Sequence, residues 1–199
     1  MVRELDQLAQ GKCRQKGTDT KKFIKKHEVP GRRRATYARI VVDYWPQKSD
    51  PNRVPLTVGG DRVDYPWDVS TPTADLITTK LLLNSTISTK GAKFMTADIK
   101  IFYLNTPMER FEYMRMAYNL IPADIIQAYG LEALKTIDGW IYIEIQKGMY
   151  GLPQAGILAN KLLTQRLRDF GYYPCTYTPG LWRHTWRPVT FALVVDDFS

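Results

Sequence analysis

The amino-acid sequence predicts an α+β fold with a mixed or antiparallel sheet and helices packed on one face. Segments in which apolar and polar residues alternate are typical of strands, and segments with apolar residues at helical spacing are typical of helices. Along the chain these segments read as a pair of strands, a helix, two strands, a helix, a strand, a helix and two strands. This order is typical of the α+β class, and 199 residues are enough to bury a sizeable core.

The first strand pair is predicted at residues 35–44 and 56–58. Residues 35–44 alternate, and Leu56-Thr57-Val58 is a short β-branched segment that is ended by Gly59 and Gly60. Four more strands are predicted from the same patterns, at residues 111–121, 140–145, 181–185 and 189–195.

Three segments predict helices. Residues 71–89 contain one helix that either Thr71 or Thr73 can cap, and we expect this helix to pack against the sheet. Residues 122–129 start with a proline at the first turn, which is a favourable position for proline. Residues 155–170 form the longest predicted helix.

The basic charge is concentrated near the N-terminus. The chain carries a formal net charge of +8, and residues 1–36 hold eleven basic and four acidic residues. We therefore expect residues 1–36 to be a basic, disordered arm, with the folded part at residues 37–199. The arm either contacts nucleic acid or is a solvated linker without a partner.

Three aspartates follow or interrupt apolar segments. Asp196 and Asp197 come directly after a predicted buried strand, and Asp98 lies within residues 94–104, a second apolar run that we expect to be a buried strand. Neighbouring carboxylates repel each other, and a shared Mg²⁺ or Mn²⁺ ion lowers that cost. The alternative for Asp196 and Asp197 is an ordinary strand that ends in an Asp-rich turn.

A set of motifs resembles the reverse transcriptase domain of copia-type LTR retrotransposons. The motifs, in chain order, are Ala97-Asp98-Ile99-Lys100, Phe102-Tyr103-Leu104-Asn105, Glu112-Tyr113-Met114, Lys147-Gly148-Met149-Tyr150-Gly151-Leu152-Pro153-Gln154-Ala155 and Val195-Asp196-Asp197. The resemblance covers roughly residues 37–199. It implies a polymerase-like palm with fingers.

The resemblance also implies the roles of individual residues. Asp98, Asp196 and Asp197 match the catalytic carboxylates that hold Mg²⁺ or Mn²⁺ in two-metal nucleotidyl transfer. Tyr103 matches the aromatic residue that excludes a ribose 2′-OH, and is otherwise a core aromatic. Gln154 matches the glutamine that lines the nucleotide pocket, and is otherwise a helix-cap residue without a role.

The sequence departs from the family pattern at two positions. Val194 stands where the family usually has an aromatic residue. Pro55 stands where the family usually has an arginine that contacts the triphosphate, and Arg53 is the nearest cation. Lys100, close to Asp98, either faces a phosphate or extends into solvent.

The resemblance implies an RNA-directed DNA polymerase whose partners are an RNA template, a DNA primer and deoxynucleoside triphosphates. The chain ends two residues after Asp197, so we expect the second strand of the catalytic hairpin and the thumb to lie beyond Ser199. The alternative is a truncated, catalytically inactive retroelement remnant that binds nucleic acid. A different metal-dependent phosphoesterase is the weakest hypothesis, because the further His or acidic clusters of such hydrolases are missing.

The remaining observations concern the cellular compartment. Cys13 and Cys175 lie far apart and predict no disulfide framework, and we expect His27 and His184 to be surface or strand residues. No apolar run approaches a membrane span, and the N-terminus has no apolar signal region. These observations predict an intracellular protein, in the cytoplasm or nucleus, that is not secreted and has no membrane partner.

Overall fold

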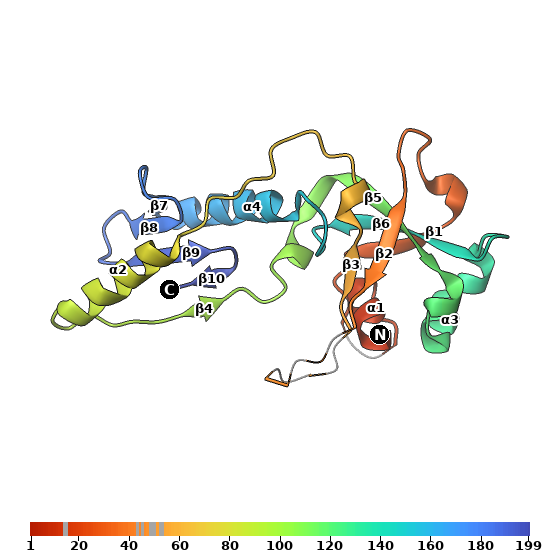
Figure 1. The fold of residues 1–199 in the computed structure, drawn as a ribbon, viewed down its shortest axis with the longest axis horizontal. Helices are drawn as coiled ribbons and strands as arrows, with labels where there is room; N and C mark the ends of the chain where they lie inside the picture. The colour runs from red at the N-terminus through yellow and green to blue at the C-terminus, as the bar shows by residue number, and fades with distance from the viewer. Residues whose placement is uncertain (14–15, 43, 45, 48–50, 52–53) are drawn as a thin grey trace. The chain divides into compact units, whose positions relative to one another are not determined.

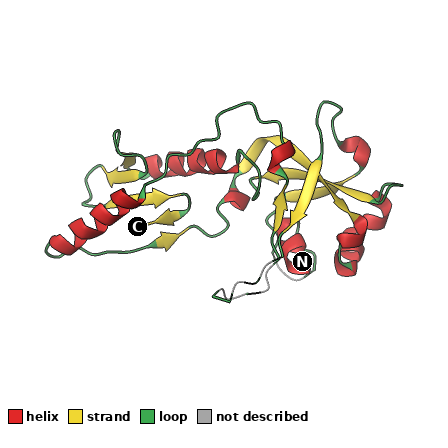
Figure 2. Ribbon diagram, viewed as in Figure 1, coloured by secondary structure: helices red, strands yellow, loops and turns green. Residues whose placement is uncertain are grey.

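The computed structural model describes residues 1–199 except 14–15, 43, 45, 48–50 and 52–53. The chain divides into two compact units, each made of two separate segments (Figure 1). The first unit comprises Met1–Trp67 and Tyr103–Ala155, and the second comprises Asp68–Phe102 and Gly156–Ser199. Each unit has its own five-stranded sheet (Figure 2). The predicted α+β class is confirmed, but the sequence did not predict the division into two sheets.

The sheet of the first unit is mixed. Its strands, in spatial order, are β1 (Lys21–Ile24), β6 (Trp140–Lys147), β5 (Pro107–Ala117), β2 (Thr36–Ile40) and β3 (Leu56–Val58). β2 and β5 pair in parallel, and the other neighbours pair antiparallel. The predicted alternation in β6 is confirmed, since Ile141, Ile143 and Ile145 are fully buried.

Short helices accompany this sheet. They are α1 (Val2–Leu8) and α3 (Ala123–Tyr129), with 3₁₀ turns at Lys26–Glu28, Gly60–Arg62, Tyr103–Asn105, Tyr118–Leu120 and Leu131–Leu134. α3 ends at Gly130, whose φ of 60° lies in the left-handed region that glycine adopts without strain. The helix predicted at residues 122–129 is therefore confirmed.

The N-terminal residues differ from the predicted disordered arm. Residues 1–36 contain α1 and β1, and β1 pairs with β6 in a register that places Phe23 opposite Ile143. Leu5 and Leu8 of α1 are buried. The physical reason is that a short apolar face is enough to add an edge strand and a helix to a sheet, even where most flanking side chains are basic.

The sheet of the second unit is antiparallel throughout. Its strands, in spatial order, are β4 (Ala97–Asp98), β10 (Asp197–Phe198), β9 (Thr190–Val194), β8 (Leu181–His184) and β7 (Tyr172–Pro174). The predicted buried strand at residues 94–104 is wrong in length and burial. Only Ala97–Asp98 is a strand, and Phe94 and Met95 are exposed.

The two longer helices lie in segments where the sequence predicts helices. α2 (Leu76–Ser88) is capped by Asp75, whose carboxylate accepts a hydrogen bond from the Thr78 N–H at 2.6 Å. This cap is neither of the two predicted threonines. α2 contacts β9 of this sheet, as expected, but no residue of the helix is buried and Ile87 is 76% exposed. α4 (Ala155–Asp169) begins and ends close to the predicted residues.

Candidate active site

Asp196 and Asp197 lie at a tight β-hairpin in the second unit. Val194 of β9 pairs with Asp197 of β10, so only Val195 and Asp196 form the turn. Val195 has a φ of 59°, in the left-handed region that a β-branched residue rarely adopts. This conformation belongs to the primed turns that join two strands through two residues. The second strand of the hairpin thus starts at Asp197, which corrects the expectation that it lies beyond Ser199.

Asp98 lies on the strand next to this hairpin. β4 and β10 pair antiparallel, and Asp98 is directly opposite Asp197. The Ile99 N–H donates a hydrogen bond of 3.1 Å to the carbonyl oxygen of Asp196. Backbone pairing therefore brings together the three predicted carboxylates, which are far apart in sequence.

The three carboxylates form a site of like charge. The pKa of Asp196 is raised, first by partial burial of its carboxyl and then by the negative charges of Asp197 and Asp98. Asp98 and Asp197 are exposed. Among the described residues, no lysine, arginine or histidine forms an ion pair with any of the three aspartates.

The donor chemistry of this site fits a hard divalent cation. Carboxylate oxygens are the ligands that Mg²⁺ and Mn²⁺ prefer, and a cation would relieve the repulsion that raises the pKa of Asp196. The side chains are not gathered as ligands, since the described part of the chain has no group of three or more His, Cys, Asp or Glu arranged to hold a metal ion. Binding would require the exposed carboxylates to turn toward one ion.

The predicted substrate-binding residues are found in different parts of the chain. Lys100 follows β4 in the second unit, and its side chain is exposed to solvent. Tyr103 belongs to the first unit and starts a 3₁₀ turn. Its ring contacts that of Tyr150 edge-to-face, with centroids 5.1 Å apart. Arg53 lies outside the described residues.

The glycines that precede the longest helix allow close backbone contacts. A Cβ atom on Gly148 would lie 2.7 Å from the carbonyl oxygen of Tyr103. Gly151 has a φ of 93°, and a Cβ atom there would lie 2.1 Å from the carbonyl oxygen of Val58 in β3. The absence of a side chain at Gly151 therefore lets this segment approach the backbone of β3.

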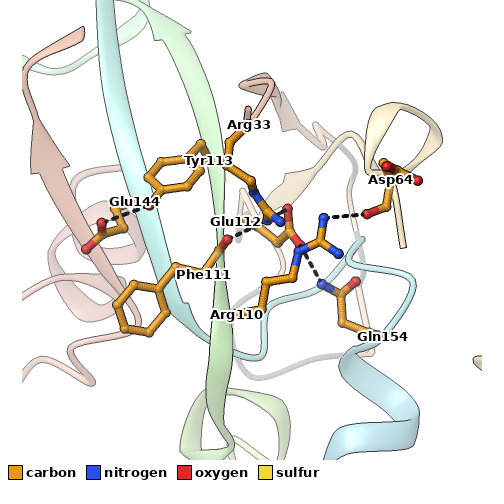
Figure 3. Close-up of polar contacts among 8 residues, drawn as sticks. All are labelled: Arg33, Asp64, Arg110, Phe111, Glu112, Tyr113, Glu144 and Gln154. Carbon is orange, nitrogen blue, oxygen red and sulfur yellow. Dashed lines mark hydrogen bonds and ion pairs between the residues drawn. The ribbon is translucent and has the colours of Figure 1, made fainter. Parts of the chain in front are cut away.

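Gln154 is part of a buried polar cluster in the first unit (Figure 3). Its side-chain Nε2 donates to Oε1 of Glu112 at 3.2 Å, and the residue is 1% exposed. Glu112 also forms an ion pair with Arg33, with 2.5 Å between Nη2 and Oε2. The Arg33 Nη2 donates in addition to the carbonyl oxygen of Phe111 at 2.6 Å.

The contacts of this cluster offset part of the cost of burying the carboxylate of Glu112. The pKa of Glu112 is raised by burial, although the hydrogen bond and charge of Arg33 and the hydrogen bond of Gln154 act in the opposite direction. Arg110 completes the cluster, with its Nε 3.9 Å from Glu112 Oε1 and its Nη2 donating to the carbonyl oxygen of Asp64 at 3.0 Å. The Oε1 atom of Gln154 is buried, with no hydrogen-bond partner among the described residues.

Sequence reasoning did not predict the burial of Glu112 or of His184. The pattern of residues 111–121 predicted a strand, but gave no sign that Glu112 is buried and paired with Arg33. His184, expected at the surface or on a strand, is on β8 and 7% exposed. Its Nδ1 accepts hydrogen bonds from the backbone N–H groups of Trp186 and Arg187, which makes it a structural residue.

None of the helices in the described residues combines the length and apolar character needed to cross a membrane. No family model matches the chain, and no curated protein or solved structure matches it either.

Proposed function

We propose that this chain is the fingers and palm of an RNA-directed DNA polymerase from a retroelement, with Asp98, Asp196 and Asp197 as its catalytic carboxylates. The observation that carries the proposal is the pairing of β4 with β10, which places Asp98 opposite Asp197 beside the hairpin turn. The second support is the order of motifs in the sequence, in which these aspartates are the matched catalytic positions.

The proposed substrates are an RNA template, a DNA primer and deoxynucleoside triphosphates. Mg²⁺ or Mn²⁺, held by the three carboxylates, would supply charge neutralisation at the attacking and leaving oxygens of nucleotidyl transfer. The backbone pairing of β4 with the hairpin fixes the separation of Asp98 and Asp197. Tyr103 and Gln154 stay predicted nucleotide contacts, and Gln154 would have to exchange its bond to Glu112 for one to a nucleotide.

A second candidate is an inactive remnant that binds nucleic acid without transferring nucleotides. The observation that favours it is that the described carboxylates do not form a ready-made ligand group, with Asp98 and Asp197 directed to solvent. The two candidates differ in one measurable property, which is template-directed extension.

The test is primer extension on an RNA template with Mg²⁺ or Mn²⁺. It compares the parent chain with Asp98→Asn and with a matched control, Asp169→Asn. Both aspartates are exposed in the second unit, so both variants are expected to fold, which circular dichroism checks. Extension by the parent and the control, with a loss of about 100-fold or more in Asp98→Asn, would support the first candidate. If none of the three extends the primer, the second candidate replaces it.

A further inference from the structure

One lysine side chain of the first unit is buried without a polar partner. Lys21 is the first residue of β1, and it is 2% exposed. Among the described residues, no atom forms a hydrogen bond with its Nζ. Lysine is almost never fully buried unless its charge is paired, because an unpaired ammonium group loses its hydration. The burial of this amine therefore points to a role other than packing.

Lys21 lines a small pocket. The volume of the pocket is about 140 Å³, and its lining also includes Lys12, Phe23 and Tyr129. These residues come from β1, from the end of α3 and from the segment after α1, all in the first unit. The Lys21 Nζ lies over the Phe23 ring, 4.9 Å from its centre, so the amine is beside the pocket. Drug-sized ligands occupy pockets of about 300 Å³ or more, so this one admits only a small molecule.

The pocket has two neighbouring rings, and each carries one lysine. The centres of the Phe23 and Tyr129 rings are 5.3 Å apart. Lys12 Nζ lies 5.1 Å from the centre of the Tyr129 ring, and Lys12 is exposed whereas Lys21 is buried. A ligand in this pocket therefore meets an exposed ammonium group at one ring and a desolvated amine at the other.

The groups around Lys21 decide how much of its amine is neutral. Burial lowers the pKa of Lys21 to about 7, and the charges of Glu4 and Asp6 on α1 act in the opposite direction. On α3, the Tyr129 hydroxyl donates to Asp6 Oδ1 at 2.8 Å, and burial raises the pKa of this tyrosine, which keeps it protonated. The neighbouring strand β6 places an apolar residue opposite Lys21. A large share of the Lys21 side chains is therefore neutral at pH 7.

A neutral lysine amine is a nucleophile, and desolvation is a known means of producing one. Its nitrogen adds to the carbonyl carbon of an aldehyde. Both amine protons move to the carbonyl oxygen, which leaves as water, so a C=N bond replaces the C=O bond without an oxidant or a reductant. The charges of Glu4 and Asp6, which attract the protonated amine, also attract the protonated imine.

We propose that Lys21 is a reactive amine that forms an imine with small aldehydes carrying an anionic group, which the ammonium group of Lys12 binds. The size of the pocket limits the aldehyde to a short chain, and Lys12 favours a negative charge at its other end. The proposal goes beyond the proposed catalysis, because it requires nothing from the aspartates of the second unit.

The test uses glyoxylate, a short aldehyde with a carboxylate, and the full chain at pH 7. Sodium cyanoborohydride reduces the imine to a stable carboxymethyl amine, and peptide mass spectrometry gives the initial rate at each lysine. We expect Lys21 to react about 10-fold faster or more than Lys22, its exposed neighbour on the same strand. In denaturing guanidinium chloride the two rates should become equal. Equal rates in the folded chain, or an excess at Lys21 that survives unfolding, would overturn the proposal.

The pH dependence gives a second readout. The ratio of the Lys21 rate to the Lys22 rate should be constant below pH 7, where both amines gain neutral form in proportion. It should fall about tenfold for each pH unit above 7, because Lys21 is then already neutral while exposed amines lose their protons only near pH 10. A ratio that does not change with pH would overturn the proposal.

The chain offers a matched pair of variants for the anionic group. Lys12→Met should slow the reaction of Lys21 with glyoxylate about 3- to 5-fold, as expected for the loss of one exposed ion pair. The same variant should leave the rate with acetaldehyde, which has no charge, unchanged. Lys161→Met, an exposed position on α4 in the second unit, should change neither rate. An unchanged glyoxylate rate in Lys12→Met, or an equal loss with both aldehydes, would overturn the assignment to anionic aldehydes.

Discussion

The two units treat their clustered acidic groups in opposite ways. In the first unit, Glu112 is 5% exposed and is paired with Arg33 and hydrogen-bonded by Gln154. In the second unit, Asp98 and Asp197 face each other across two strands, and the described residues place no cation in an ion pair with them. The charge of one cluster is balanced by a cation of the protein, whereas the charge of the other is left to solvent and dissolved ions.

This difference separates a structural carboxylate from a candidate functional one. A buried carboxylate without a counter-charge is costly, so the pairing of Glu112 is what the fold itself requires. The aspartates avoid most of that cost by exposure, and the part that remains is seen in the raised pKa of Asp196. Residues held together against their own repulsion are good candidates for binding a cation.

The largest stability effect is expected from breaking the Glu112 pair. Arg33→Met should lower the free energy of unfolding by about 3 kcal/mol, because it leaves a buried carboxylate uncompensated. Urea denaturation measures this change. The control is Arg62→Met, whose partner Asp61 is exposed, and there the loss should be within about 0.5 kcal/mol. Equal losses would mean that burial of the Glu112 pair has no energetic weight.

Lys21, a buried cation in the first unit, gives a second test of what a buried charge costs the fold. The pKa of Lys21 is lowered to about 7 by burial, against the attraction of Glu4 and Asp6. The unfolded chain binds more protons than the folded one between that value and the ordinary pKa of 10.5, so stability should rise with pH across this window. Lys21→Met should stabilise the protein by about 2 kcal/mol below pH 7, and the gain should disappear above pH 10.5. Urea denaturation at several pH values checks this, and the exposed Lys22→Met is the control. A gain that does not change with pH would contradict the proposed cause.

Magnesium should stabilise the protein, and it should do so only by binding to the aspartate cluster. Mg²⁺ at a tenfold excess over its dissociation constant should add about 1.4 kcal/mol to the stability of the parent, since binding to the folded state alone shifts the unfolding equilibrium. Thermal unfolding with and without Mg²⁺ measures this shift. Asp98→Asn should lose it, whereas Asp169→Asn should retain it. A shift of equal size in Asp98→Asn would place the ion elsewhere.

The smallest effect is expected at Asp196. Its raised pKa means that the folded chain holds this proton more tightly, so the ionised carboxylate costs stability above the folded pKa. Asp196→Asn should therefore raise the melting temperature by about 1–3 °C near neutral pH in the absence of metal. The gain should vanish below about pH 4, where both states are protonated. A lower melting temperature at neutral pH would show that the carboxylate is stabilised by a contact instead.

Local patterns predicted those elements that local forces determine. The strands at residues 140–145 and 56–58 and the helix at residues 122–129 agree with the structure, because alternation, turn glycines and a helix-ending glycine act over a few residues. The resemblance to the reverse transcriptase domain also implied that Asp98 and the aspartate pair lie at one site. What it lacked was the pairing itself, which the register of β4 against β10 supplies.

The failures have a common physical cause. The apolar run at residues 94–104 was expected to be buried, yet it is largely exposed. α2 contacts β9 as expected, yet none of its residues is buried. The basic residues 1–36 were expected to be disordered, yet they contain a paired strand. Composition and spacing describe the segment alone, whereas burial depends on the partners that the fold brings to it. The pairing of Arg33 with Glu112 was unpredictable for the same reason.

The interleaving of the two units has a consequence for the order in which the protein can fold during its synthesis. β6 pairs with both β1 and β5, so the sheet of the first unit cannot close before residue 147 has left the ribosome. Until then, β1 cannot pair with β6. The segment that contains Asp98 has already been made by that time. The hairpin of the aspartate pair is the last of the described elements to emerge. The three aspartates would therefore come together only after the first unit had been completed. A nascent chain would spend most of its synthesis with unpaired strand edges that chaperones can recognise.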